Sequence, residues 1–232
     1  MIAGMRSLWR TIGPTQRRDI ALVGVADGIV GLAFGALAVA AGLPAWVPML
    51  MSVLVFAGGA QFAAVSIVAA GGSAAAAVVA GLVLNARHLP FGFAVADVFD
   101  RGGGWRRALD MHWLIDESVA FTLRESEPAR RRAVYLVAGG GLFVIWNLAV
   151  VAGAVAGSVL PDPAALGLDA AFPAVLLALV GPHLKDRRTR AAALTGAAVA
   201  LATVPFLPAG LPVLLSLVGL AVLISPARRT VA

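Results

Sequence analysis

Residues 20–43 read IALVGVADGIVGLAFGALAVAAGL, an apolar run that contains a single charged side chain, Asp27. A helix needs about 20 predominantly apolar residues to cross the hydrocarbon core of a bilayer, and this run is long enough. In lipid, a helix satisfies its own backbone hydrogen bonds, so the run predicts a transmembrane helix. It is too long for the apolar core of a secretory signal, and we expect it to be retained.

The remaining sequence has the same apolar character. Of the 232 residues, 60% are hydrophobic and 13% are charged, whereas a soluble domain has about 25% charged residues. Transmembrane β-strands would need short alternating segments with one polar face, which this chain lacks. We therefore predict an all-α, polytopic transmembrane helical bundle. Its apolar runs are 20–43, 46–70, 73–98, 133–157, 168–184, 190–207 and 211–225.

Basic residues outnumber acidic ones by 18 to 12, giving a net charge of +6. They gather at the ends of the apolar runs, as membrane orientation requires, and there is no soluble basic domain for nucleic acid. We expect a lipid bilayer, and no nucleic acid, as a partner. The chain has no cysteine and three histidines, and it lacks phosphate-loop and hydrolase motifs. We expect no metal, no cofactor and no enzymatic activity.

The positions of the arginines predict the topology. Three full crossings before residue 99 would place the arginine-rich stretch 99–132 outside the cell, against the positive-inside rule. One early run therefore should not cross fully. We expect about six full spans in an inner membrane, with both termini cytoplasmic. The expected divisions are a basic N-terminus (1–19), one transmembrane domain (20–227, with the cytoplasmic loop 99–132) and a C-terminal tail (228–232).

The run 46–70 is the best candidate for the segment that does not cross. Its middle contains Gly58 and Gly59, with Gln61 close behind, and this combination weakens a helix at mid-membrane depth. Broken helices are tolerated in membranes where they line a protein-buried cavity, and they often form binding sites there. We predict a re-entrant or discontinuous segment. Seven plain spans that violate the charge rule remain the alternative.

Three glycines in the first run predict close helix packing. Gly28, Gly31 and Gly35 lie on or near one face of the helix, and small residues let a neighbouring backbone approach.

Polar side chains inside the apolar runs are candidate site residues, because each is costly in lipid unless it is paired. They are Asp27, Gln61, Asn85, Arg87 and His88. Arg87 keeps its proton at any reachable pH, so its burial requires a protein carboxylate or a substrate carboxylate. The alternative is that Arg87 snorkels to an interface and His88 only packs.

The polar stretch 99–132 separates the third and fourth runs. We expect one short helix in it, Met111–Leu123, which is too short to cross the membrane. Asp116 and Glu117 lie on this helix and are candidates for gating or proton coupling. A solvated helix face is the alternative.

Three motifs give the chain a resemblance to a known family. They are Phe56-Ala-Gly-Gly-Ala-Gln61, Asn85-Ala-Arg87-His88-Leu-Pro90 and Asp116-Glu117-Ser118. Their order and spacing resemble the AzlC family of bacterial permeases. The resemblance implies the large subunit of a two-component exporter of valine, leucine and isoleucine, with methionine as a further candidate. It also implies a small, hydrophobic AzlD-type partner subunit.

The polar residues suit a zwitterionic substrate. Its carboxylate needs a cation or a helix N-terminus, which Arg87 or the backbone N–H groups at Gly58 and Gly59 could provide. Its ammonium needs an acceptor, which Asp27 could provide with Gln61 or Asn85. Asp27 or Glu117 could exchange a coupling proton.

Other functions remain open from the sequence. The chain could be a non-transporting scaffold or assembly subunit, in which the polar cluster has no common purpose. A membrane-embedded enzyme would have to use Asp116, Glu117 and His112. Within transport, uptake or another small zwitterion or anion is an alternative.

Overall fold

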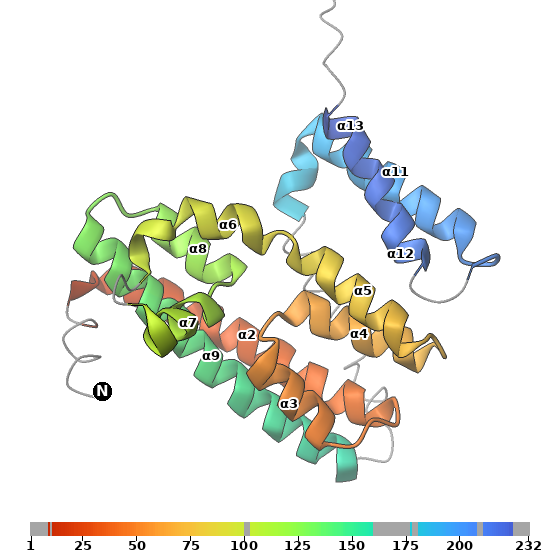
Figure 1. Cartoon of the computed structure of the whole chain (residues 1–232), viewed down its shortest axis with the longest axis horizontal. Helices are drawn as coiled ribbons and strands as arrows, with labels where there is room; N and C mark the ends of the chain where they lie inside the picture. Colours follow the sequence, from red (N-terminus) through yellow and green to blue (C-terminus); the bar gives the residue numbers. More distant parts are fainter. Residues whose placement is uncertain are drawn as a thin grey trace, which may run out of the picture.

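The computed structural model describes residues 9, 11–99, 103–159, 177, 181–207 and 211–224. These residues form helices and turns, with no strand among them, so the all-α prediction is confirmed (Figure 1). The elements are α2 (Pro14–Ala40), α3 (Trp46–Leu54), α4 (Gly58–Ala69), α5 (Ala74–Asn85), α6 (His88–Ala94), η1 (Ala96–Val98), α7 (Gly104–His112), α8 (Asp116–Leu123), α9 (Pro128–Val159), η3 (Gly181–Lys185), α11 (Arg187–Thr203), α12 (Leu211–Leu215), η4 (Ser216–Leu220) and α13 (Ala221–Ile224).

Three of the described helical segments are long and apolar enough to cross a membrane. They are α2, α9, and α5 taken together with α6 as one segment, 74–94. The predicted total of six spans is not established by these segments. The predicted run 168–184 lies largely outside the described residues, and the run 211–225 is divided among the short helices α12, η4 and α13.

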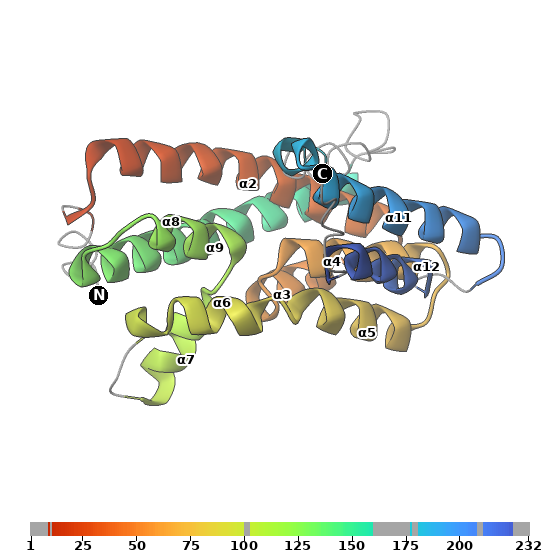
Figure 2. The same cartoon turned by 90° about the horizontal axis from the view of Figure 1, so that it is seen from above.

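Helices α2 and α9 form the centre of the fold and pack in parallel. A Cβ added at Gly31 would lie 3.2 Å from Ala149 Cβ, and one added at Gly35 would lie 2.6 Å from Ala154 N. The contacts therefore advance along both helices in the same direction, as Figures 1 and 2 show. Gly31 and Gly35 permit this close approach, as the glycine pattern predicted.

Helices α3 and α4 form a hairpin rather than one continuous helix. In Figures 1 and 2, α3 runs back from the C-terminal end of α2, the chain turns, and α4 returns toward that end. The turn occupies residues 55–57, directly before the glycine pair. Phe56 has φ 41°, which is a genuine outlier for a bulky residue. The predicted discontinuity of 46–70 is therefore present, and the glycines begin the second helix instead of ending the first.

A second break separates α5 from α6. Helix α5 ends at Asn85, and α6 begins at His88. Pro90 lies in the first turn of α6, where a missing N–H costs no intrahelical hydrogen bond. The break therefore precedes Pro90, and Arg87 occupies it.

The polar stretch contains two helices, so the prediction of one helix over Met111–Leu123 was wrong. Ile115 is extended (φ −131°, ψ 167°), and its N–H donates to Ser118 Oγ over 3.0 Å. This hydrogen bond supports a new helix start at Asp116, which separates α8 from α7.

Polar contacts hold η1 and the polar stretch that follows it against the start of α9. Arg131 donates to both carboxylate oxygens of Asp97, over 2.8 and 3.0 Å. The hydrogen bonds from Arg131 hold the pKa of Asp97 below its usual value. Tyr135 Oη donates to Asp110 O over 2.6 Å. The stretch is therefore packed against the bundle.

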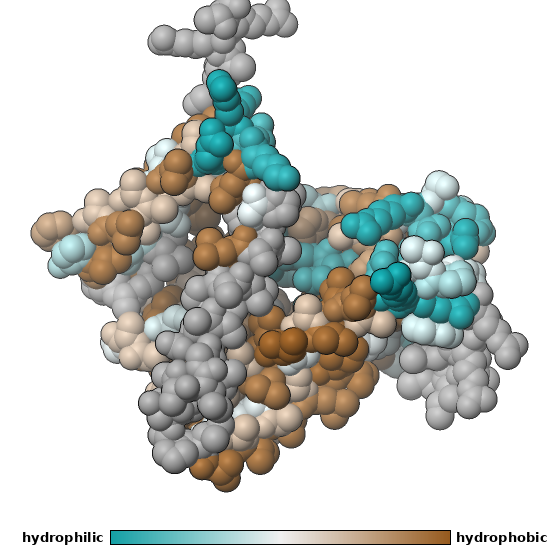
Figure 3. Space-filling model, turned by 180° about the vertical axis from the view of Figure 1, so that it is seen from behind, coloured by the Kyte–Doolittle hydropathy of each residue, from teal (hydrophilic) through white to brown (hydrophobic). Residues whose placement is uncertain are grey.

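Large apolar side chains remain exposed along the long helices. Examples are Leu22, Val25 and Ile29 on α2, and Leu148 and Val155 on α9. Figure 3 shows apolar surface over much of one face, with hydrophilic residues gathered toward two edges. In lipid such apolar surface meets a matching solvent, which fits a membrane protein.

The hairpin predicts a labelling pattern for single cysteines, since the chain has none of its own. Pro44→Cys and Ala74→Cys, both at exposed positions, should react with an impermeant maleimide from the same side of the membrane. Trp105→Cys, in the exposed start of α7, should react from the other side. Labelling of residues 44 and 74 from opposite sides would show instead that α3 and α4 cross the bilayer.

The α2–α9 contact predicts opposite effects for two glycine substitutions. Gly35→Ala should lower the free energy of unfolding by about 1–3 kcal/mol, because its Cβ meets the backbone of α9. Gly141→Ala should be neutral or stabilising by up to about 1 kcal/mol, because a Cβ there meets no atom within 4 Å and alanine favours the helix. Unfolding in mixed detergent would measure both. Equal losses would contradict the backbone contact.

Candidate functional site

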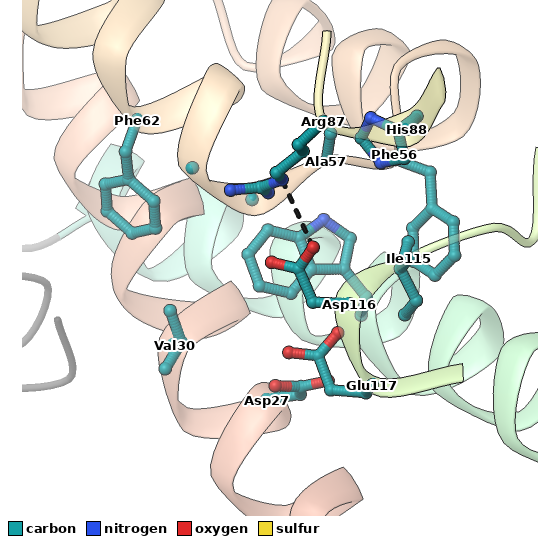
Figure 4. Close-up of a pocket in the computed structure, with 13 residues that line it drawn as sticks. Asp27, Val30, Phe56, Ala57, Phe62, Arg87, His88, Ile115, Asp116 and Glu117 are labelled. Carbon is teal, nitrogen blue, oxygen red and sulfur yellow. Dashed lines mark ion pairs between the residues drawn. The ribbon is translucent and has the colours of Figure 1, made fainter. Parts of the chain in front are cut away.

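A cavity of about 120 Å³ lies where the two helix breaks meet α2, α8 and α9 (Figure 4). Its wall combines charged side chains with apolar ones. It is lined by Asp27, Val30, Phe56, Ala57, Gly58, Gly59, Phe62, Arg87, His88, Ile115, Asp116, Glu117 and Trp146.

The N-terminus of α4 opens into this cavity. Gly58 and Gly59 are its first residues, and the first hydrogen bond of the helix runs from Gln61 N–H to Ala57 O over 3.0 Å. The N-cap residue, Ala57, makes no side-chain capping hydrogen bond to the N–H groups that precede it. A helix N-terminus carries partial positive charge and favours an anion. This end of the cavity therefore suits a carboxylate.

Arg87 reaches the same end of the cavity from the α5–α6 break. A Cβ on Gly59 would lie 3.7 Å from one of its terminal nitrogens. Its Nε lies 3.1 Å from Asp116 Oδ1. Both atoms are buried, and the angle between the groups is not that of a hydrogen bond. The two side chains thus form a close ion pair that leaves hydrogen-bonding capacity unused.

Two more carboxylates lie on the opposite side of the cavity. Figure 4 shows Asp27, from α2, next to Glu117, from α8, with Asp116 between them and Arg87. Burial is the largest effect on Glu117 and raises the pKa of its carboxyl above the ordinary value of 4.5. Three carboxylates face one guanidinium, so this side of the cavity favours a cation or a bound proton.

Aromatic and aliphatic side chains close the remaining wall. Phe62 packs edge-to-face on Phe34, with ring centroids 5.2 Å apart, and Phe34 stacks on Trp146 at 6.1 Å. Val30 and Ile115 complete the apolar surface. The cavity thus has an anion-binding end, a cation-binding side and an apolar wall.

The structure brings most of the predicted site residues together. Asp27, Gly58, Gly59, Arg87, His88, Asp116 and Glu117 line the same cavity. Their roles in binding or coupling stay predictions.

Gln61 and Asn85 do not line this cavity. Gln61 is fully buried in α4, and neither of its amide atoms has a hydrogen-bond partner among the described residues. Asn85 lines a neighbouring apolar cavity of about 420 Å³ between α3, α4 and α5. Gln61 and Asn85 could therefore contact a substrate in this cavity only if the helices were arranged differently.

Several residues at the site were missed by sequence reasoning. Trp146 is more typical of interface anchoring or packing than of ligand binding, and Phe56 was noted only as the first residue of the motif that contains the glycine pair. His112 was considered only for an enzyme, but its Nε2 lies 2.7 Å from Val53 O, where it satisfies a carbonyl at the end of α3. Nothing in the sequence predicts this contact, because 59 residues separate His112 from Val53.

The lining of the cavity falls within the part of the chain that one family model matches. A family model described as AzlC protein matches residues 23–160, which include every residue that lines the cavity. No solved structure matches the chain.

Two curated relatives are similar to the chain. The "Branched-chain amino acid transport protein AzlC" of Bacillus subtilis is 26% identical over 180 residues, covering 75% of this chain and 68% of the relative. An "Uncharacterized membrane protein" of Helicobacter pylori is 32% identical over 92 residues, covering 40% of each chain.

The buried carboxyl of Glu117 predicts a pH effect on stability. Because folding raises its pKa, the unfolded chain releases this proton first, and wild-type stability should fall as the pH rises above about 4.5. Glu117→Gln removes the effect, so the variant should gain thermal stability relative to the wild type as the pH rises above 4.5. The same substitution at exposed Glu127 controls for loss of one charge. A difference that does not change with pH would contradict the assignment.

Proposed function

The chain belongs to the AzlC family of membrane transport proteins, and from this premise we propose that it is a permease subunit that exports branched-chain amino acids. Valine, leucine and isoleucine are the proposed substrates, with methionine as a further candidate. The name of the Bacillus subtilis relative supports this substrate class. The observation that carries the proposal is the cavity, whose wall offers a separate surface to each part of such a molecule.

The proposed orientation follows from the charges. The substrate carboxylate lies at the N-terminus of α4, beside Arg87, and the ammonium lies toward Asp27 and Glu117. The branched side chain contacts the apolar wall that includes Val30 and Phe62. Binding sites at discontinuous helices commonly pair a helix N-terminus with an anionic substrate group in this way.

Proton coupling is proposed for the acidic side of the cavity. Asp27 and Glu117 come from different helices and lie next to each other in Figure 4. Two neighbouring carboxylates in a buried site do not both ionise readily, so the pair favours a bound proton. An arriving ammonium stabilises the ionised pair and favours release of that proton. This exchange would couple substrate movement to a proton gradient.

The proposed membrane arrangement places the basic ends of α2 and α9 on the cytoplasmic side of an inner membrane. The parallel packing of these helices supports it, because both begin near basic residues. The proposal retains the basic N-terminus 1–19, the transmembrane domain 20–227 and the tail 228–232, with both termini cytoplasmic. The small AzlD-type partner rests on the family resemblance.

A scaffold or assembly subunit remains the second candidate. The carboxylates and the guanidinium in one cavity argue against it, because such groups are costly to bury and need a purpose. A scaffold would tolerate their neutralisation without any change in amino-acid efflux.

Dipeptide-loaded cells test the proposed function. Cells expressing the chain, with and without its small partner, are fed a valine-containing dipeptide, and the valine released to the medium is measured. The complete system should accelerate efflux of valine but not of lysine, and a protonophore should abolish the acceleration. Efflux that does not depend on the chain would overturn the proposal.

Arg87→Ala in this assay should lower valine efflux roughly tenfold or more, because it leaves the Asp116 carboxylate unbalanced near the substrate carboxylate and an interaction with a charged group is worth about 1.5–3 kcal/mol. Membrane insertion should be unchanged. Arg106→Ala is the matched control, because Arg106 is exposed on α7 and lies over the Trp105 ring at 5.8 Å. Normal efflux by the Arg87 variant would remove this residue from the site.

A further inference from the structure

Trp146 carries a buried indole N–H that the packing of the fold does not use. The residue is only 6% exposed, and its Nε1 has no hydrogen-bond partner among the described residues. An unpaired buried donor is unfavourable, so an unsatisfied group in a native structure calls for an explanation. Trp146 is also one of the residues that line the cavity.

The indole lies against the N-terminus of α4. A Cβ added at Gly58 would lie 3.0 Å from Cη2 and 3.5 Å from Cζ2 of Trp146. The six-membered ring of the indole therefore packs against the first residue of α4, and Nε1 is bonded to the same ring carbon as Cζ2, one of the contacting atoms. Gly31 and Phe34 support the other parts of the ring. The donor is therefore held in a fixed position.

Arg87 is less available as a carboxylate ligand than its charge suggests. Asp116 lies 3.1 Å from its Nε and offsets its charge. The N–H groups that open α4 and the indole N–H have no such competitor among the described residues. Neutral donors held in place can bind an anion without prior separation of an ion pair.

We infer that Trp146 Nε1–H donates a hydrogen bond to the carboxylate of the transported amino acid, together with the N–H groups at Gly58 and Gly59. This inference rests on the proposed function and adds a specific substrate contact to it. Trp146 is then a binding residue that selects for a carboxylate. The Arg87–Asp116 pair borders the site and balances charge. Glycine at position 58 gives the indole room to reach this point.

Displacement of radiolabelled L-leucine from membrane vesicles containing the full chain tests the inference. The competitors are L-valine and isobutylamine, which is valine without its carboxylate. Trp146→Phe keeps a buried aromatic ring and removes the N–H. It should weaken competition by valine about tenfold or more, as expected for a lost hydrogen bond to a charged group. Competition by isobutylamine should change less than twofold.

Trp113→Phe is the matched control. The Nε1 of Trp113 is also buried and unpartnered among the described residues, but Trp113 does not line the cavity. This variant should bind both competitors like the wild type. Gly58→Ala is a second test that leaves the indole chemically intact, because its Cβ would push against the ring. Gly58→Ala should weaken competition by valine more than competition by isobutylamine. It keeps the inference testable if the Trp146 variant does not fold.

Three results would overturn the inference. Unchanged valine competition in both the Trp146 and Gly58 variants would show that the N–H makes no contact with substrate. An equal loss for valine and isobutylamine would show a general effect on the site. If the wild-type chain binds no leucine, both the proposed function and the Trp146 contact are wrong. If the wild-type chain binds leucine normally and the variants behave like it, only the Trp146 contact is wrong.

Discussion

The close contact between the backbones of α2 and α9 is the constraint on which the rest of the structure depends. Gly31 and Gly35 let α9 approach so closely that a methyl group added at Gly35 would collide with the α9 backbone. The contact fixes α2 and α9 in parallel, so both begin on the same side. The chain between them must return to the end where both helices begin, and because α3 and α4 double back on each other, α5 and α6 make this return.

The two helix breaks follow from this return path and create the site. Each break frees backbone groups, which is tolerable at membrane depth only within protein. His112 contacts a carbonyl at the end of α3, and the N–H groups of α4 open into the cavity. Arg87 occupies the other break. Helix α8 then brings two carboxylates to them, because Ser118 supports a helix start at Asp116.

Much of this arrangement could be predicted from the chain alone. Long apolar runs predicted helices, the arginine pattern indicated that one early run is irregular, and the double glycine located the discontinuity to within a few residues. Asp27 and Arg87 were found because charged groups inside apolar runs are costly. Glu117 was a candidate on the helix of the polar stretch, with a solvated helix face as the alternative. The division of 111–123 into two helices was missed, since the Ile115–Ser118 hydrogen bond depends on how that stretch packs. Trp146 was missed because a tryptophan in an apolar run usually packs.

The sequence by itself determined that this protein is helical, belongs in a bilayer and carries polar groups that must find partners there. Those properties follow from transfer free energies and backbone hydrogen bonding, which act locally along the chain. Only the tertiary structure decided which of these groups meet. It separated Gln61 and Asn85 from the cavity and joined Asp27 to Glu117, and it left the Trp146 N–H unpaired beside α4. Such pairings depend on packing between distant segments, where a rotation of one helix changes every neighbour.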